Sequence, residues 1–250
     1  RTKKQIAAYK EKVRNRQKLL NDYKQYNRYR KVCGNDMPKT FEKFRDMKYN
    51  ESVKWKETQA IYRKSNAYGK IIAKEPEITA DLTKISNDTG VSMIGLEHRV
   101  KTKDSFLRKV GTDSNHSLDA QVITDTINST NDVIRYTYQD NPLNLTNAYM
   151  NVTDAMKAKG YEVIRVKNTW LDKRSAYKGV NCIFKAPSGQ KFEIQFHTPE
   201  SFKIKDGPMH KLYEQSRLET TTPEKQAELN KKMFELSAQL EVPVNIDRIK

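Results

Sequence analysis

The chain has 250 residues, of which 36% are hydrophobic and 31% charged, and its mean hydropathy is −0.89. This composition predicts a soluble protein with one good core or two modest ones. No run approaches the ~18 apolar residues of a membrane helix. Two cysteines, Cys33 and Cys182, exclude a disulfide framework and predict ordinary thiols in a reducing compartment. Because the chain starts at Arg1 without an initiator Met or signal peptide, we expect a piece of a longer protein.

The positive charge is concentrated at the front of the chain. The net charge is +16, and residues 1–75 hold 22 Lys/Arg against 8 Asp/Glu, whereas residues 76–250 hold 25 against 23. A basic stretch favours nucleic acid or another polyanion through counterion release. A solvated helical face is an equally good interpretation, so the charge alone does not choose between them.

The first 75 residues predict a basic helical segment. Apolar residues at near-helical spacing predict a long helix over 3–31, and shorter helices are predicted at 39–48 and 51–66. Gly, Asn, Asp and Pro at 33–38 end the first helix. We place the domain boundary near residue 75, where the charge balance also changes.

Residues 76–250 predict an α/β (α+β) domain, with a small mixed β-sheet flanked by helices. Helices are predicted at 77–88, 104–110, 117–128, 143–159, 199–218 and 223–240. Strands are predicted at 132–138, 161–167, 179–185 and 191–197, with the last two joined as a hairpin by a Pro-Ser-Gly turn, and 91–96 is a short apolar segment. The last helix is predicted to begin with a capping hydroxyl from Thr222, followed by Pro223 and the acidic Glu224 in its first turn.

The strand at 191–197 alternates between two kinds of residue. Phe192, Ile194 and Phe196 are predicted to point one way, and Glu193, Gln195 and His197 the other. A solvent face would be built from Lys, Thr or Ser. Glu193 is able to bind Mg²⁺ or to accept a proton from a hydroxyl, and His197 to hydrogen-bond a phosphate. The pattern therefore indicates a floor on which a metal-bound nucleotide reacts.

Three further clusters carry candidate chemistry. Cations at 99–109 predict a strand-to-helix corner that grips a triphosphate, although charge runs are usually solvated faces. Asp132 and Arg135 lie in a predicted buried strand, where charges need a partner or a ligand; an internal ion pair is the other interpretation. Asn168 and Trp170 precede Tyr177 and Lys178. Tyr177 is able to stack on a nucleobase while Lys178 contacts a phosphate; the other interpretation is that Tyr177 is an ordinary aromatic residue of a hairpin.

Taken together, these clusters resemble the synthetase domain of the RelA/SpoT family, which makes alarmones. The R-x-K-x-x-x-S-x-x-x-K pattern at 99–109 resembles the ATP-binding stretch of that family, Tyr177-Lys178-Gly179 its base-stacking loop, and Phe192-Glu193-Ile194-Gln195 its V-E-[VI]-Q strand. The resemblance covers about 90–218. It implies a nucleotidyltransferase-like synthetase fold and an ATP-dependent 3′-pyrophosphokinase without a hydrolase half.

The resemblance also implies roles for individual residues. Mg²⁺ is expected as the cofactor, held by Asp132 and Glu193, with Arg135, Gln195 and His197 completing the catalytic set. The expected ATP-binding residues are Arg99, Lys101, Ser105, Arg108 and Lys109. The expected acceptor-binding residues are Asn168, Trp170, Tyr177, Lys178 and His210.

The sequence departs from the family at three places. The spacing from Asp132 to Arg135 is shorter than the usual D-x-x-x-x-R, and His197 stands where relatives commonly carry Arg. The usual N-G-Y-R reads Ser-Ala-Tyr-Lys at 175–178. These variants look closest to toxin-type and phage-encoded members. Residues 33–50 also resemble the C-terminal end of phage minor head proteins.

The expected partners are ATP and a purine nucleotide acceptor, giving (p)ppGpp or (p)ppApp, with an immunity protein or antitoxin and no membrane. A toxin delivered into a cytoplasm, or carried by a phage particle, fits this interpretation. The same chemistry on the 3′ end of tRNA is one alternative. A DNA- or capsid-binding structural protein without catalysis, using the basic helices, is another.

Overall fold

The computed structural model describes residues 2–51, 53–218 and 220–250. The chain forms two compact units, one made of Arg1–Lys70 with Thr102–Thr130 and the other of Ile71–Lys101 with Asn131–Lys250. The expected boundary near residue 75 lies close to the first of these divisions, and the return of 102–130 to the first unit was not foreseen. Within the described residues, no helix has the length and apolarity to cross a membrane.

The first unit is helical, as the spacing of its apolar residues predicts. Its elements are α1 (Lys3–Cys33), η1 (Gly34–Asp36), α2 (Phe41–Tyr49), α3 (Val53–Ile72, which runs past the division), α5 (Lys103–Asp113) and α6 (Ala120–Ser129). Thr2 and Gln5 form a capping box at the start of α1, and Gly34 ends it with a φ of 58°. The predicted helices at 3–31, 39–48 and 51–66 are confirmed, each to within a few residues except at the end of α3.

Aromatic rings make the core of the first unit. Phe44 is fully buried and contacts Tyr26, Tyr29 and Trp55, with ring centroids 5.4, 5.8 and 5.4 Å away. By contrast, the described residues 2–21 of α1 are exposed. Burial of the last turns of α1 against α2 and α3 therefore holds this unit together.

The second unit contains a five-stranded mixed sheet in the order β1-β2-β5-β4-β3. Its strands are β1 (Ser92–Ile94), β2 (Arg135–Gln139), β3 (Glu162–Asn168), β4 (Val180–Lys185) and β5 (Lys191–His197). Only β2 and β5 pair in parallel; the other three pairs are antiparallel. The mixed sheet and its flanking helices confirm the predicted fold class, and the β4–β5 hairpin is confirmed as well.

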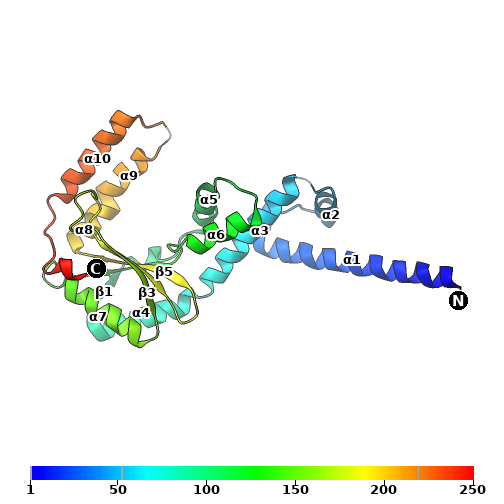
Figure 1. Cartoon of the computed structure of the whole chain (residues 1–250), viewed down its shortest axis with the longest axis horizontal. Helices are drawn as coiled ribbons and strands as arrows, with labels where there is room; N and C mark the ends of the chain where they lie inside the picture. Colours follow the sequence, from blue (N-terminus) through cyan, green and yellow to red (C-terminus); the bar gives the residue numbers. More distant parts are fainter. Residues whose placement is uncertain (1, 52, 219) are drawn as a thin grey trace. The chain divides into compact units, whose positions relative to one another are not determined.

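The remaining elements of the second unit lie beside this sheet or project beyond it (Figure 1). They are α4 (Glu75–Thr89), η2 (Leu96–His98), α7 (Leu145–Ala158), α8 (Pro199–Ile204), η3 (Lys205–Met209), α9 (His210–Ser216), α10 (Pro223–Ser237) and η4 (Ile246–Arg248). Helices α4 and α7 pack against each other, as do α9 and α10. The capping hydroxyl of Thr222 and Pro223 begin α10 as predicted.

One helix prediction is wrong. The structure replaces the continuous helix at 199–218 by α8, a π-type turn and α9, with Gly207 in a non-helical conformation at φ −101° and ψ −105°. Pro208 follows directly and has no backbone N–H to donate. The Gly-Pro pair therefore interrupts the helix; it is a breaker signal that the predicted continuous helix ignored.

Replacing Phe44 with Ala is expected to destabilise the first unit by about 3–5 kcal/mol, because it empties a fully buried aromatic site. The chain has two tryptophans, so a Trp170→Phe background leaves Trp55, a direct neighbour of Phe44, as the fluorescent probe. Chemical denaturation followed at Trp55 measures the change. Leu20→Ala is the control, because Leu20 is 46% exposed, and an equal loss in both variants would contradict this account of the core.

Candidate functional site

The two faces of β5 differ as the alternation predicted. Phe192, Ile194 and Phe196 are fully buried in the hydrophobic core. On this side α7 contributes Tyr149, whose ring lies edge-on to Phe196 at 5.2 Å, and α4 accepts a hydrogen bond from Tyr138 at the backbone oxygen of Leu82. The predicted division of the strand into an apolar and a polar face is therefore confirmed.

The opposite face of the sheet carries the polar candidates. Arg135 of β2 is the direct neighbour of Glu193, and Asn181 of β4 is the neighbour of Gln195. Side chains of such cross-strand neighbours stand on the same face. The Gln195 amide donates a 2.5 Å hydrogen bond to a carboxylate oxygen of Glu193, which fixes the direction of that carboxylate. The sheet thus brings Arg135, Glu193 and Gln195 together.

Asp132 lies just before β2 rather than inside it, because the strand starts at Arg135. The preceding residues pair instead with the segment that carries the expected phosphate-binding cations: the Lys101 N–H donates to the Val133 oxygen at 2.8 Å. This pairing sets the Lys101 ammonium 3.3 Å from Asp132 Oδ2. Two predicted site residues therefore meet in an ion pair.

Asp132 also supports a test of the expected Mg²⁺ site. Its Oδ1 atom is buried and has no hydrogen-bond partner. A buried carboxylate oxygen without a donor is costly and suits a hard cation, which prefers oxygen ligands. Within residues 2–51, 53–218 and 220–250, no group of three or more His, Cys, Asp or Glu side chains is gathered as a metal site. The residues present fit an ion held by few protein ligands, with substrate phosphates supplying the others.

Arg99, expected to bind ATP, is engaged with Glu75 of α4. Its Nε donates to Glu75 Oε1 at 2.5 Å, and one of its terminal nitrogens donates to the Leu96 oxygen at 2.7 Å. Burial alone would raise the pKa of the Glu75 carboxyl, but hydrogen bonds from Arg99 and Thr79 outweigh it and lower that pKa. Thr79 is in turn 2.8 Å from the hydroxyl of Tyr136 in β2. Glu75 therefore links α4, the Arg99 segment and the sheet.

The other expected ATP-binding residues belong to the first unit. Ser105, Arg108 and Lys109 lie on α5, whose first turn is capped by Thr102. Arg108 is exposed, and Lys109 forms an ion pair of 3.2 Å with Asp113 on the same helix. Their role in binding ATP stays a prediction.

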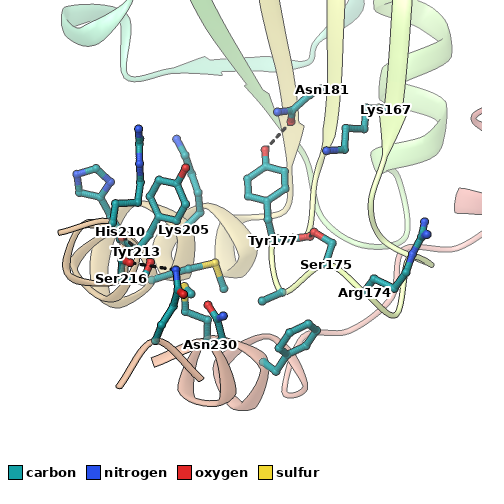
Figure 2. A pocket seen from close by; sticks show the side chains of 16 residues that line it. Lys167, Arg174, Ser175, Tyr177, Asn181, Lys205, His210, Tyr213, Ser216 and Asn230 are labelled. Carbon is teal, nitrogen blue, oxygen red and sulfur yellow. Dashed lines mark hydrogen bonds between the residues drawn. The ribbon is translucent and has the colours of Figure 1, made fainter. Parts of the chain in front are cut away.

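A cavity of about 700 Å³ opens beside the β4 end of the polar face (Figure 2). The loop before β4 forms one wall, and α9 and α10 form the other. Its cationic or imidazole side chains are Lys167, Arg174, Lys205, His210 and Arg217, and its aromatic side chains are Tyr177, Tyr213 and Phe234. None of its lining residues, all of which the structure describes, is Asp or Glu. The cavity suits a ligand that combines negative charge with a flat ring.

The buried end of this cavity is a hydrogen-bonded network. The Tyr177 hydroxyl lies 2.5 Å from Asn181 Oδ1 and 2.8 Å from His197 Nε2, and His197 Nδ1 lies 2.9 Å from the Ser201 hydroxyl. Ser201 belongs to the capping box that starts α8. The network fixes the hydroxyl end of Tyr177, while the ring lines the cavity (Figure 2).

His197 contacts protein groups through both ring nitrogens, and its expected hydrogen bond to a phosphate stays a prediction. It is fully buried, and burial, together with Lys205 and Arg135, lowers its pKa to about 3. The imidazole is therefore neutral at physiological pH. Its Nε2 contacts the Tyr177 hydroxyl.

Three of the expected acceptor-binding residues also face elsewhere. The Asn168 amide donates to the backbone oxygens of Ile246 and Ile249, and Trp170 is 3% exposed. The Lys178 ammonium donates to the Thr169 and Asp172 oxygens. The hydrogen bonds of Lys178 stabilise the loop before β4, and those of Asn168 attach the C-terminal segment to β3. Of the five, Tyr177 and His210 line the cavity.

Sequence reasoning missed several residues that the fold brings to the cavity. They are Lys167, Arg174, Asn181, Lys205, Tyr213 and Arg217. Asn181 had a usable signal, because β4 and β5 form a predicted hairpin and Asn181 faces Gln195 across it. The residues of α9 and α10 had no such signal, since their approach to the sheet depends on the turn at Gly207.

Both cysteines are free and buried, in line with the expectation of ordinary thiols. Burial raises the pKa of the Cys33 thiol to about 11. Neither thiol therefore belongs to the candidate site.

Comparison with solved structures identifies the fold. Small alarmone synthetase 2 from Bacillus subtilis matches with a TM-score of 0.50 at 15% identity, covering 69% of this chain and 89% of that one. The type VI effector Tas1, solved in complex with its immunity protein, matches with a TM-score of 0.48 at 19% identity over 70% and 96% of the two chains. Small alarmone synthetase 1 from Bacillus subtilis, solved with its product pppGpp, matches at 0.47 and 16% over 67% and 86%.

The chain thus has the small alarmone synthetase fold that the sequence resemblance implied, and the match covers 69% of its length. No family model and no curated protein sequence matches the chain. The resemblance of residues 33–50 to phage minor head proteins has no support from these comparisons.

Gly179 is expected to be essential to the Tyr177–His197 network. A Cβ atom at this position would lie 2.7 Å from both His197 Cε1 and the Tyr177 hydroxyl. Gly179→Ala should therefore lower stability by about 1–3 kcal/mol, as overpacking does, and displace Tyr177. Gly69→Ala in α3 is the matched control, because a Cβ there meets nothing within 4 Å, and it should be neutral or stabilising. Equal thermal stability of the two variants would contradict the close approach.

The Glu75–Arg99 pair predicts a pH dependence. The pKa of Glu75 is lowered in the folded protein from a reference of 4.5, so its contribution to stability is complete above about pH 4.5 and is lost as the pH falls through the folded value. The difference in free energy of unfolding between the wild type and Glu75→Gln should therefore be largest near neutral pH and shrink below pH 4.5. Urea denaturation across pH 3–7 measures it; a difference that grows on acidification would contradict the assignment.

Proposed function

We propose that the protein is an ATP-dependent pyrophosphokinase. It moves the β,γ-pyrophosphate of ATP onto the 3′-hydroxyl of a purine nucleotide, with AMP as the leaving group, and makes (p)ppGpp or (p)ppApp. The observation that supports this most strongly is the pairing of Glu193 with Arg135 on the polar sheet face, next to a cavity that is rich in cations and free of carboxylates. The small alarmone synthetase fold is consistent with the proposal.

Phosphoryl transfer depends on positioning and on neutralising the charge of the transferred group. In our proposal Arg135 and Lys101 contribute positive charge, and Glu193, oriented by Gln195, accepts the proton of the attacking 3′-hydroxyl. The Tyr177 ring offers the acceptor base a stacking surface, and His210 lies across the same cavity. Arg99, Ser105, Arg108 and Lys109 are the further candidates for the ATP phosphates.

Asp132 and Glu193 are the residues that would hold Mg²⁺. The ion would neutralise charge on the transferred phosphates. The orphaned Oδ1 of Asp132 and the salt bridge of its other oxygen with Lys101 support this assignment. Asp132→Asn is expected to lower the affinity for Mg²⁺, so that half-maximal turnover requires a higher Mg²⁺ concentration.

The acceptor could be a free nucleotide or the 3′ end of tRNA. The cavity volume of about 700 Å³ is in the range of small-ligand sites and favours a mononucleotide. Consumption of ATP would make the activity toxic to a cell, so we also propose an immunity protein or antitoxin as a partner.

Glu193→Gln is expected to reduce turnover by several orders of magnitude, because it removes both a metal ligand and the proton acceptor. Glu162→Gln on the edge strand β3 is the matched control and should keep full activity, since Glu162 is exposed. Purified proteins are incubated with ATP and GDP, GTP, ADP or AMP, and the products are separated by chromatography. Near-normal turnover in Glu193→Gln would remove Glu193 from the site.

A parallel incubation with labelled ATP and tRNA separates the two acceptors. Label transferred to tRNA, with every free nucleotide unchanged, would replace the nucleotide acceptor by the tRNA end. Salt-sensitive DNA binding by a folded protein that turns over neither acceptor would contradict the proposed enzyme.

A further inference from the structure

Lys205 occupies an unusual position for a charged side chain. It is the first residue of the π-type turn Lys205–Met209 that separates α8 from α9, and its side chain is 19% exposed. Figure 2 shows it lining the cavity between Tyr177 and the α9 residues. Turns of this π type are frequent at functional sites because they redirect side chains. Lys205 keeps helical dihedral angles at the end of α8, and its side chain lines the cavity from there.

The Lys205 ammonium has little compensation in the described part of the chain. It makes no hydrogen bond there, and its carboxylate neighbour Asp206 is 4.0 Å away and 63% exposed. The ammonium also lies 4.9 Å from the centroid of the Phe202 ring, and Glu193 adds a weak electrostatic attraction. A largely buried ammonium without an acceptor costs free energy, which a bound anion would recover.

The surroundings of Lys205 connect it to the predicted reaction centre. The Phe202 ring also contacts His197 at 5.9 Å, and His197 holds the Tyr177 hydroxyl. Burial lowers the pKa of the Lys205 ammonium, and the positive charge of Arg135 lowers it further, while Glu193 opposes that change. Lys205 and Arg135 are thus close enough to repel each other electrostatically, which favours a bound anion beside Lys205.

We propose that Lys205 is a phosphate-binding residue of this cavity and binds one phosphate group of the nucleotide. The neutral His197 supplies no charge at this point, so the ammonium that follows it on the turn does. This inference deepens the proposed function and rests on it, because the phosphate belongs to a substrate of the pyrophosphokinase. It adds Lys205 to the residues that the sequence pattern indicated.

The test uses inorganic pyrophosphate as the probe, because its binding requires no turnover. Titration calorimetry with the full chain compares the wild type with Lys205→Met, which keeps the length of the side chain and removes its charge. Loss of a charge-assisted contact should weaken pyrophosphate binding by about tenfold or more. Lys205→Arg should keep most of the affinity. Lys203→Met is the matched control, because Lys203 is exposed on α8, and it should bind as the wild type does.

Thermal unfolding of the ligand-free proteins gives a second readout. Lys205→Met should be at least as stable as the wild type, because it removes a poorly compensated buried charge, whereas pyrophosphate should stabilise it less than the wild type. Unchanged pyrophosphate affinity in Lys205→Met would overturn the inference. Tight binding through Lys205 in a protein that forms no 3′-pyrophosphorylated nucleotide would instead contradict the proposed function and leave this phosphate site intact.

Discussion

The second unit depends on strand β5, which serves two opposite purposes. One face packs Phe192, Ile194 and Phe196 against the helices that cover the sheet, and the other presents Glu193 and Gln195 to the candidate site. Because side chains alternate along a strand, a slip of one residue would exchange the two faces. The burial of three large apolar side chains therefore fixes the register and, with it, the position of Glu193 opposite Arg135.

The same strand determines how the site is covered. Its last residue, His197, is buried against Ser201 and Phe202 of α8, so the helix that follows must cross the polar face closely. The Gly207–Pro208 break then lets α9 and α10 form the second wall of the cavity. The cavity therefore has the neutral imidazole of His197 at its buried end and cationic side chains around its opening.

Much of this arrangement could be predicted from local patterns. The strand 191–197 matches its observed bounds, and the helix starts at Thr2 and Thr222 follow from side-chain caps that are visible in the sequence. The polar trio on β5 was visible for the same reason, since alternation with a period of two is a local property. The resemblance to RelA/SpoT synthetases added the fold, which the match to small alarmone synthetase 2 supports.

Contacts between distant segments could not be predicted from the sequence. His197 was expected to meet a phosphate, but its burial depends on α8 and on Tyr177 from the loop before β4. Asn168 and Trp170 were assigned to the acceptor by their position near Tyr177, whereas the C-terminal segment takes the Asn168 amide. Lys205 had no periodic signal at all. The local sequence of these segments does not indicate which distant side chain or backbone group each residue contacts.

The central claim is that Glu193 and its neighbours direct transfer of an intact pyrophosphate to a ribose 3′-oxygen. Phosphorus NMR of the wild-type reaction with ATP and GDP tests it most directly. The account predicts AMP together with a new diphosphate that is scalar-coupled to the ribose H3′ of the acceptor. Formation of ADP by transfer of a single phosphate, or no product from a folded protein with any purine acceptor, would contradict it.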